Sequence, residues 1–135
     1  GWSQLPPIGV PIISPQILLQ SGDEVEYTVY FLSDGNQPVQ NAKFCDSIPN
    51  GTKFIPDSFG SGSGILVNMA NTVTPKTNAA DSDNASFFSP LAPLPTNNVC
   101  SNQNNLKGAA IANFGNLDNT TGNNYGFVRF RVKID

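Results

Sequence analysis

An alternation with a period of two residues, beginning at Glu24, constrains the possible folds most strongly. Apolar side chains occupy every second position of this run, at Val25, Tyr27, Val29 and Phe31. Successive side chains of a β-strand point to opposite faces, so this spacing places all four on one face of a strand. We therefore expect a strand with one buried face and with the charged side chains of the run exposed.

A second strand is predicted shortly after the first. Asp34-Gly35-Asn36 interrupts the alternation, and Pro38 excludes a helix through this region. Ala42 and Phe44 then resume the apolar pattern, until Ile48-Pro49-Asn50-Gly51 ends it. Two strands joined by an Asp-Gly turn and ended by an Asn-Gly turn are typical of β structure.

The end of the chain carries the same signal. Residues 125–134 alternate apolar with cationic side chains, and residues 108–117 place Ala110, Ala112 and Phe114 on one face. Further strands are expected at 16–20, 52–59 with a bend at Pro56, Ile65–Met69 and Ala85–Phe88. The residues predicted to be mostly buried are Val25, Tyr27, Val29, Phe31, Ala42, Phe44, Val128, Phe130 and Val132. Those predicted to be exposed are Glu24, Glu26, Arg129 and Arg131.

Composition limits the classes of protein that remain. Seventeen asparagines and only 13% charged residues favour turns and strands over long solvated helices. The net charge of −3 and the scattered cations argue against nucleic-acid binding. No apolar stretch approaches the roughly 20 residues that span a bilayer, so we expect no membrane insertion by this segment. We interpret residues 1–135 as one domain from a longer polypeptide.

Between residues 71 and 106 the periodicity fails. Apart from Ala85–Phe88, this region is an irregular connection rich in Asn, Ser and Pro. It is long, because connections in compact domains have a median of about 4–6 residues. Either it carries function or it contains irregular strands that periodicity does not reveal.

Several short motifs resemble one bacterial repeat. In the first half they are Gly22-Asp23, Asp34-Gly35-Asn36, Asn41-Ala42-Lys43-Phe44-Cys45-Asp46 and Ile48-Pro49-Asn50-Gly51-Thr52-Lys53-Phe54. Near the end they are Asn113-Phe114-Gly115-Asn116-Leu117, Thr121-Gly122 and residues 126–135. In this order they resemble the bacterial surface-protein repeat catalogued as domain of unknown function 11. The resemblance covers roughly half of the chain, and the middle does not match.

This resemblance implies an all-β fold, an immunoglobulin-like antiparallel β-sandwich, here with a long irregular connection. It also implies a non-catalytic structural or adhesive module of a secreted or cell-surface bacterial protein. The implied partners are neighbouring domains of the same polypeptide, and another surface protein or a glycan. The expected localisation is extracellular or at the cell surface.

The chain has two cysteines, Cys45 and Cys100. They are either two buried free thiols of a cytosolic protein or one disulfide. The loop-rich composition around Cys100, together with the extracellular setting that the resemblance implies, favours the disulfide. Because Phe44 takes the apolar face, Cys45 is expected to point outward. The bridge would then tether the connection to the outer face of the sandwich.

Catalytic chemistry finds little support in the sequence. The absence of histidine removes Ser-His-Asp and Cys-His catalysis, and the ten acidic residues are scattered and mostly adjoin turns. We therefore expect no enzyme activity.

The one metal candidate is the pair Asp81 and Asp83, whose alternate oxygen ligands suit calcium. No EF-hand pattern surrounds them, and a solvated loop with Asx turns is the favoured explanation. The alternative to a structural module is thus a calcium- or carbohydrate-binding module that uses residues 71–106. Apart from this calcium, no cofactor is expected.

The stripe of Arg129, Arg131 and Lys133 has two readings. It could face an acidic glycan or another partner. It could also be an exposed sheet face that its charges keep soluble and protect from edge pairing. The second reading is favoured.

Overall fold

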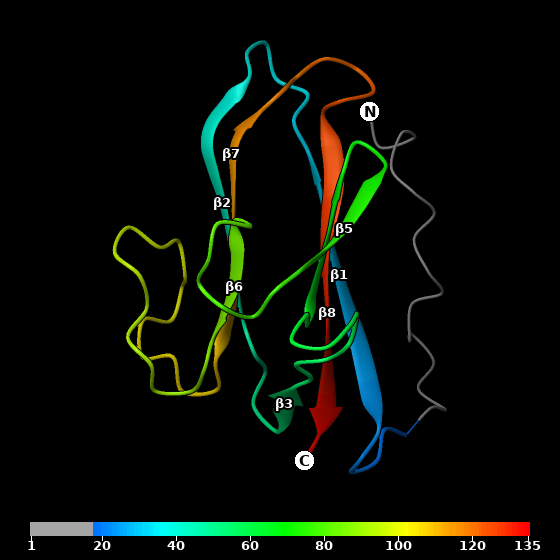
Figure 1. The fold of residues 1–135 in the computed structure, drawn as a ribbon, viewed down its shortest axis with the longest axis vertical. Coiled ribbons are helices and arrows are strands. Elements are labelled where there is room, and N and C mark those ends of the chain that lie inside the picture. Colours follow the sequence, from blue (N-terminus) through cyan, green and yellow to red (C-terminus); the bar gives the residue numbers. More distant parts are fainter. Residues whose placement is uncertain (1–17) are drawn as a thin grey trace.

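The computed structural model describes residues 18–135, and these residues form eight β-strands without a helix (Figure 1). The strands are β1 (Glu24–Leu32), β2 (Val39–Ser47), β3 (Thr52–Phe54), β4 (Ile65–Met69), β5 (Thr72–Lys76), β6 (Ala85–Phe88), β7 (Ala109–Leu117) and β8 (Tyr125–Ile134). Of the strand predicted at 16–20, residues 16 and 17 lie outside the described residues, and residues 18–20 are not part of a strand. Within 18–135 no helix is long and apolar enough to cross a membrane.

The strands form two antiparallel sheets. One sheet has the order β1-β8-β4-β5, and β3 also pairs with β8. The other has three strands in the order β2-β7-β6. In Figure 1 the three-stranded sheet lies on the left and the sheet containing β1, β5 and β8 lies on the right. The two sheets pack together as a β-sandwich, which confirms the predicted fold class.

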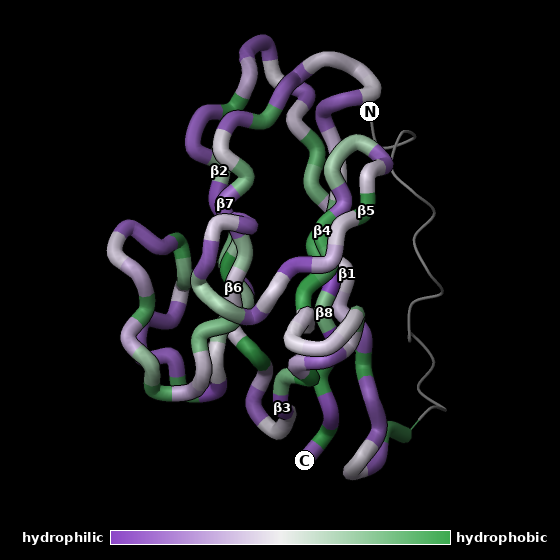
Figure 2. Tube along the Cα trace, viewed as in Figure 1, coloured by the Kyte–Doolittle hydropathy of each residue, from purple (hydrophilic) through white to green (hydrophobic). Residues whose placement is uncertain are grey.

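The core lies between the inner faces of the sheets. Its largest fully buried side chains are Phe130, Ile65, Val128 and Val132, three of which come from β8. This strand is central because β1 and β4 flank it, and the apolar residues gather along β4 and β8 in Figure 2. Alternation in β8 therefore has the predicted register. Val25, Tyr27, Phe31, Ala42 and Phe44 are half-buried, since they lie nearer the sides of the sandwich.

One predicted core residue is exposed. The prediction for Val29 was wrong, because 38% of this residue is accessible to solvent. Within the described residues β1 is an edge strand, and the facing sheet has three strands against five. Val29 therefore receives less cover from the opposite sheet than its partner Val128 on the central strand.

Arg129 and Arg131 were predicted to be exposed, but both are half-buried. The Arg129 guanidinium lies 4.5 Å from the centre of the Phe127 ring, and that of Arg131 lies 5.0 Å from the centre of the Phe59 ring. Both side chains also contact Glu26, at 3.2 and 2.9 Å. Stacking on aromatic rings covers the planar groups while their charges stay paired.

The pairing of the first two strands differs from a simple hairpin. β1 pairs with β8, whereas β2 pairs with β7 in the other sheet. The Asp34-Gly35 segment is thus a crossover between the sheets. The structure also contains β5, which periodicity did not reveal. Its residues are nearly all exposed and include Pro75, so this edge strand has no apolar face to produce an alternation.

An aromatic pair joins the two sheets near the C-terminal end of β8. The rings of Phe54 in β3 and Phe87 in β6 stack with centroids 4.0 Å apart and an interplanar angle of 10°. Each ring also packs against a glycine, Gly64 for Phe54 and Gly108 for Phe87. A methyl group on either glycine would overlap the ring, so both positions require the absence of a side chain.

We predict that Gly108→Ala destabilises the domain more than Gly122→Ala does. Both glycines have a φ of +96°, but only Gly108 packs against a ring, whereas a Cβ at Gly122 would meet nothing within 4 Å. The control should cost about 1 kcal/mol for its backbone conformation. Gly108→Ala should cost a further 1–3 kcal/mol, roughly, from overpacking. Urea unfolding measures the free energy of unfolding of both variants. Equal losses of this free energy would show that the aromatic contact is unimportant.

Candidate functional site

The disulfide between Cys45 and Cys100 is present, with Cα atoms 5.0 Å apart. Cys45 pairs with Ile111 of β7, whereas the preceding Phe44 pairs with the buried Ala112 and packs against the core. Cys45 therefore lies on the outer face of the three-stranded sheet, as predicted. Cys100 belongs to residues 89–108, which link β6 to β7 and which we call the connection. The disulfide fastens the connection to that face.

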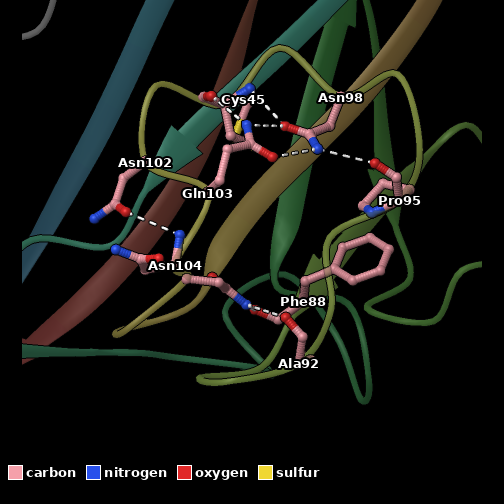
Figure 3. Close-up of a disulfide and its surroundings, with 10 residues drawn as sticks. Cys45, Phe88, Ala92, Pro95, Asn98, Asn102, Gln103 and Asn104 are labelled. Atoms are coloured by element: carbon pink, nitrogen blue, oxygen red, sulfur yellow. Dashed lines mark hydrogen bonds between the residues drawn. A yellow bond between two sulfur atoms is a disulfide. The ribbon is translucent and has the colours of Figure 1, made fainter.

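Amide side chains order the connection around the disulfide (Figure 3). Asn98 Oδ1 accepts hydrogen bonds from the Cys100 N–H at 2.9 Å and from Gln103 Nε2 at 2.8 Å. Asn98 Nδ2 donates to the Pro95 carbonyl at 2.9 Å, and Gln103 Nε2 also donates to the Cys100 carbonyl at 2.6 Å. These bonds replace the strand pairing that the connection lacks.

Asn105 holds the first part of the connection. Its side chain is buried, and Nδ2 donates to the carbonyls of Ser89 and Ala92 at 2.7 and 3.2 Å. The backbone carbonyl of Asn105 accepts a hydrogen bond from the Leu91 N–H at 2.8 Å. The asparagine-rich composition of this region thus serves its internal hydrogen bonding. Sequence periodicity could not show this, because the bonds are irregular in spacing.

Asp81 and Asp83 lie together in the turn between β5 and β6. The Thr77 hydroxyl donates to Asp81 Oδ2 at 2.6 Å, and the Asp83 N–H donates to Asp81 Oδ1 at 2.9 Å. The N–H groups of Thr77 and Ala85 donate to the two Asp83 oxygens at 2.7 and 3.1 Å. All four carboxylate oxygens therefore accept hydrogen bonds within the turn. Across residues 18–135, no three acidic, cysteine or histidine side chains gather as a metal-binding group.

These hydrogen bonds affect ionisation. The Thr77 hydroxyl and the Asp83 N–H lower the pKa of Asp81 below its ordinary value of 3.8. Thr120 lowers the pKa of Asp118 in the same way, in the turn before β8. A depressed folded-state pKa stabilises the fold above the unfolded-state value, and that stabilisation is lost as the pH falls through the folded-state pKa.

Asp46 has the opposite environment. It lies on the inward face of β2, two residues from both Phe44 and the buried Ile48, and it pairs with the buried Ala110. Burial raises the pKa of its carboxyl above 3.8. Within the described part of the chain no hydrogen bond or ion pair to this carboxylate offsets the burial. An inward-pointing charge on an edge strand discourages pairing with another chain.

Two hollows lie near the C-terminal end of β8. One, of about 510 Å³, has a mixed lining that includes Glu24, Lys53, Lys133 and Asp135. The other, of about 350 Å³, lies beside the stacked Phe54 and Phe87 rings. Sequence reasoning missed both, because their residues come from separate strands and loops and form no motif.

Two of the three cationic side chains of the stripe are engaged within their own sheet. Arg129 Nε donates to the Thr28 hydroxyl at 2.9 Å, and both arginines contact Glu26. Lys133 is exposed. The two arginines are thus engaged within their own sheet face, which favours the structural reading of the stripe over the partner-binding one.

Comparisons with known proteins identify no relative: no family model, no curated protein and no solved structure matches this chain.

We predict that Asp46→Asn raises the melting temperature at pH 7 and leaves it unchanged at pH 3. The folded-state pKa is raised, so the carboxyl is neutral at low pH, and its ionisation destabilises the fold as the pH rises through that pKa. Thermal melts of wild type and Asp46→Asn across this range provide the measurement. Asp34→Asn, at an exposed turn position, is the matched control. A lower melting temperature for Asp46→Asn at pH 7 would mean that the ionised carboxylate stabilises the fold.

Proposed function

We propose that this domain is a non-catalytic structural module of a secreted or cell-surface bacterial protein. The observation that carries the proposal is the Cys45–Cys100 disulfide, which holds the connection against the outer face of the three-stranded sheet. Disulfides form and persist in oxidising compartments, which include the cell exterior. The motifs that resemble a bacterial surface repeat support the same setting.

The use of the polar side chains supports a structural role. The side chains of Asn98, Gln103 and Asn105 bond to the connection itself, and those of Asp81 and Asp83 bond to their own turn. Groups that bind or transform a ligand need free donors or acceptors directed toward it. These groups are instead used to maintain the fold. Calcium binding by Asp81 and Asp83 is less favoured for the same reason.

An adhesive contribution would come from the connection. Leu91 and Val99 are 75% and 54% exposed there, although the disulfide and the amide network restrain the backbone around them. A restrained loop binds a partner at a lower cost in conformational entropy than a free one does. Another surface protein or a glycan would meet this face, while neighbouring domains of the same polypeptide would adjoin the ends of the sandwich.

Pulling on single molecules tests the structural role. We predict that the disulfide withholds about 190 Å of chain from extension, because it closes a separation of 55 residues at roughly 3.5 Å each. The oxidised domain should therefore show a contour-length gain shorter by this amount than the reduced domain. A tandem array of the domain in an atomic force microscope provides the measurement.

The double variant Cys45→Ser/Cys100→Ser is the control, and it should extend like the reduced domain. An oxidised domain that extends without any resolved unfolding event would contradict the proposed structural role. Equal contour lengths before and after reduction would show that no disulfide bears the load.

A further inference from the structure

We propose that the hollow beside the Phe54–Phe87 stack binds small organic acids in which a carboxylate is joined to an apolar group. This inference is independent of the structural role proposed above. The hollow measures about 350 Å³, which falls in the range of small-molecule sites of roughly 300–1,000 Å³. Its lining combines apolar side chains from both sheets and the connection with two lysines.

The apolar part of the site is well defined. Phe54 and Phe87 are held in place by their mutual stacking and by the glycines behind them. Pro90 and Leu106 of the connection complete the lining, and Leu106 is 57% exposed. An apolar ligand group in the hollow would remove this leucine and the ring surfaces from water, which is favourable.

The charges at the hollow select an anion. Its charged lining residues are Lys53 and Lys107, and none of the lining residues is acidic. Both ammonium groups already share one carboxylate, since Asp135 Oδ1 lies 3.2 Å from Lys53 Nζ and Asp135 Oδ2 lies 3.9 Å from Lys107 Nζ. The Asp135 carboxylate thus shows that one carboxylate can contact both lysines. A ligand carboxylate would take its place.

In this arrangement Asp135 competes with the ligand carboxylate for the two lysines. Side chains of Lys53 and Lys107 are 79% and 40% exposed, so the existing ion pairs are weak and readily exchanged. Removal of the Asp135 charge should strengthen binding, while removal of either lysine should weaken it. Opposite effects from neighbouring residues distinguish a site of this kind from general surface adsorption.

The test is a titration of the ¹⁵N-labelled domain with 4-phenylbutyrate, followed by amide chemical shifts. The uncharged analogue 4-phenyl-1-butanol serves as the ligand control. We expect 4-phenylbutyrate to shift amides at Phe54, Phe87, Leu106 and the two lysines, and the alcohol to bind more weakly. Raising the salt concentration should weaken the binding of the acid but not that of the alcohol, because salt screens exposed charges.

Variants complete the test. Lys53→Gln and Lys107→Gln should each weaken 4-phenylbutyrate binding about two- to fivefold, and Asp135→Asn should tighten it by a similar factor. Lys76→Gln removes a positive charge that lines a different hollow, with Met69 and Phe114, and should change little. Shifts confined to other surfaces, equal binding of acid and alcohol, or an Asp135→Asn variant that binds no tighter would each overturn the proposal. The spectra themselves report whether each variant is folded.

Discussion

The Cys45–Cys100 disulfide holds the connection against the outer face of the three-stranded sheet. The connection carries few buried apolar side chains, so hydrophobic burial alone gives it little reason to lie against β2 and β7. In the chain-entropy model, closing a loop of 55 residues stabilises the fold by about 4 kcal/mol. Once the ends are held together, the amide side chains of Asn98 and Gln103 satisfy the backbone groups near the bridge.

The other half of the molecule is organised differently, by burial of a central strand. β8 contributes Val128, Phe130 and Val132 to the core and pairs with β1, β3 and β4. The stacked Phe54 and Phe87 rings then link this sheet to β6 of the smaller one. The domain thus combines a hydrophobic core with a covalent fastening on its outer surface. Such a combination suits a domain that folds in an oxidising compartment, where disulfides form and persist.

Periodicity predicted the strands with one buried face, because their alternation is a direct consequence of that burial. It placed β8 and the register of Phe130 correctly, and the same alternation pointed Cys45 outward. It could not reveal β5, which is exposed on both faces, or the order of the connection, which rests on irregular amide bonds. The half-burial of Arg129 was also missed, because alternation assigns its side chain to the outer face but does not show that the guanidinium lies over the Phe127 ring on that face.

The lysine-lined hollow shows a further limit of sequence reasoning. Lys53 follows β2 in the chain, whereas Lys107 precedes β7, and only the packing of the two sheets brings them to one carboxylate. No spacing in the sequence signals such a meeting. Sites of this kind become visible only when the register of both sheets is known.

Hydrogen exchange tests directly whether the disulfide orders the connection against the outer face of the three-stranded sheet. The measurement compares amide protection in the wild-type domain and in Cys45→Ser/Cys100→Ser. We predict that protection falls in residues 89–108 and in β2, while β4 and β8 keep theirs, because their order rests on the core. Unchanged protection in the connection, or a uniform loss throughout the domain, would contradict it.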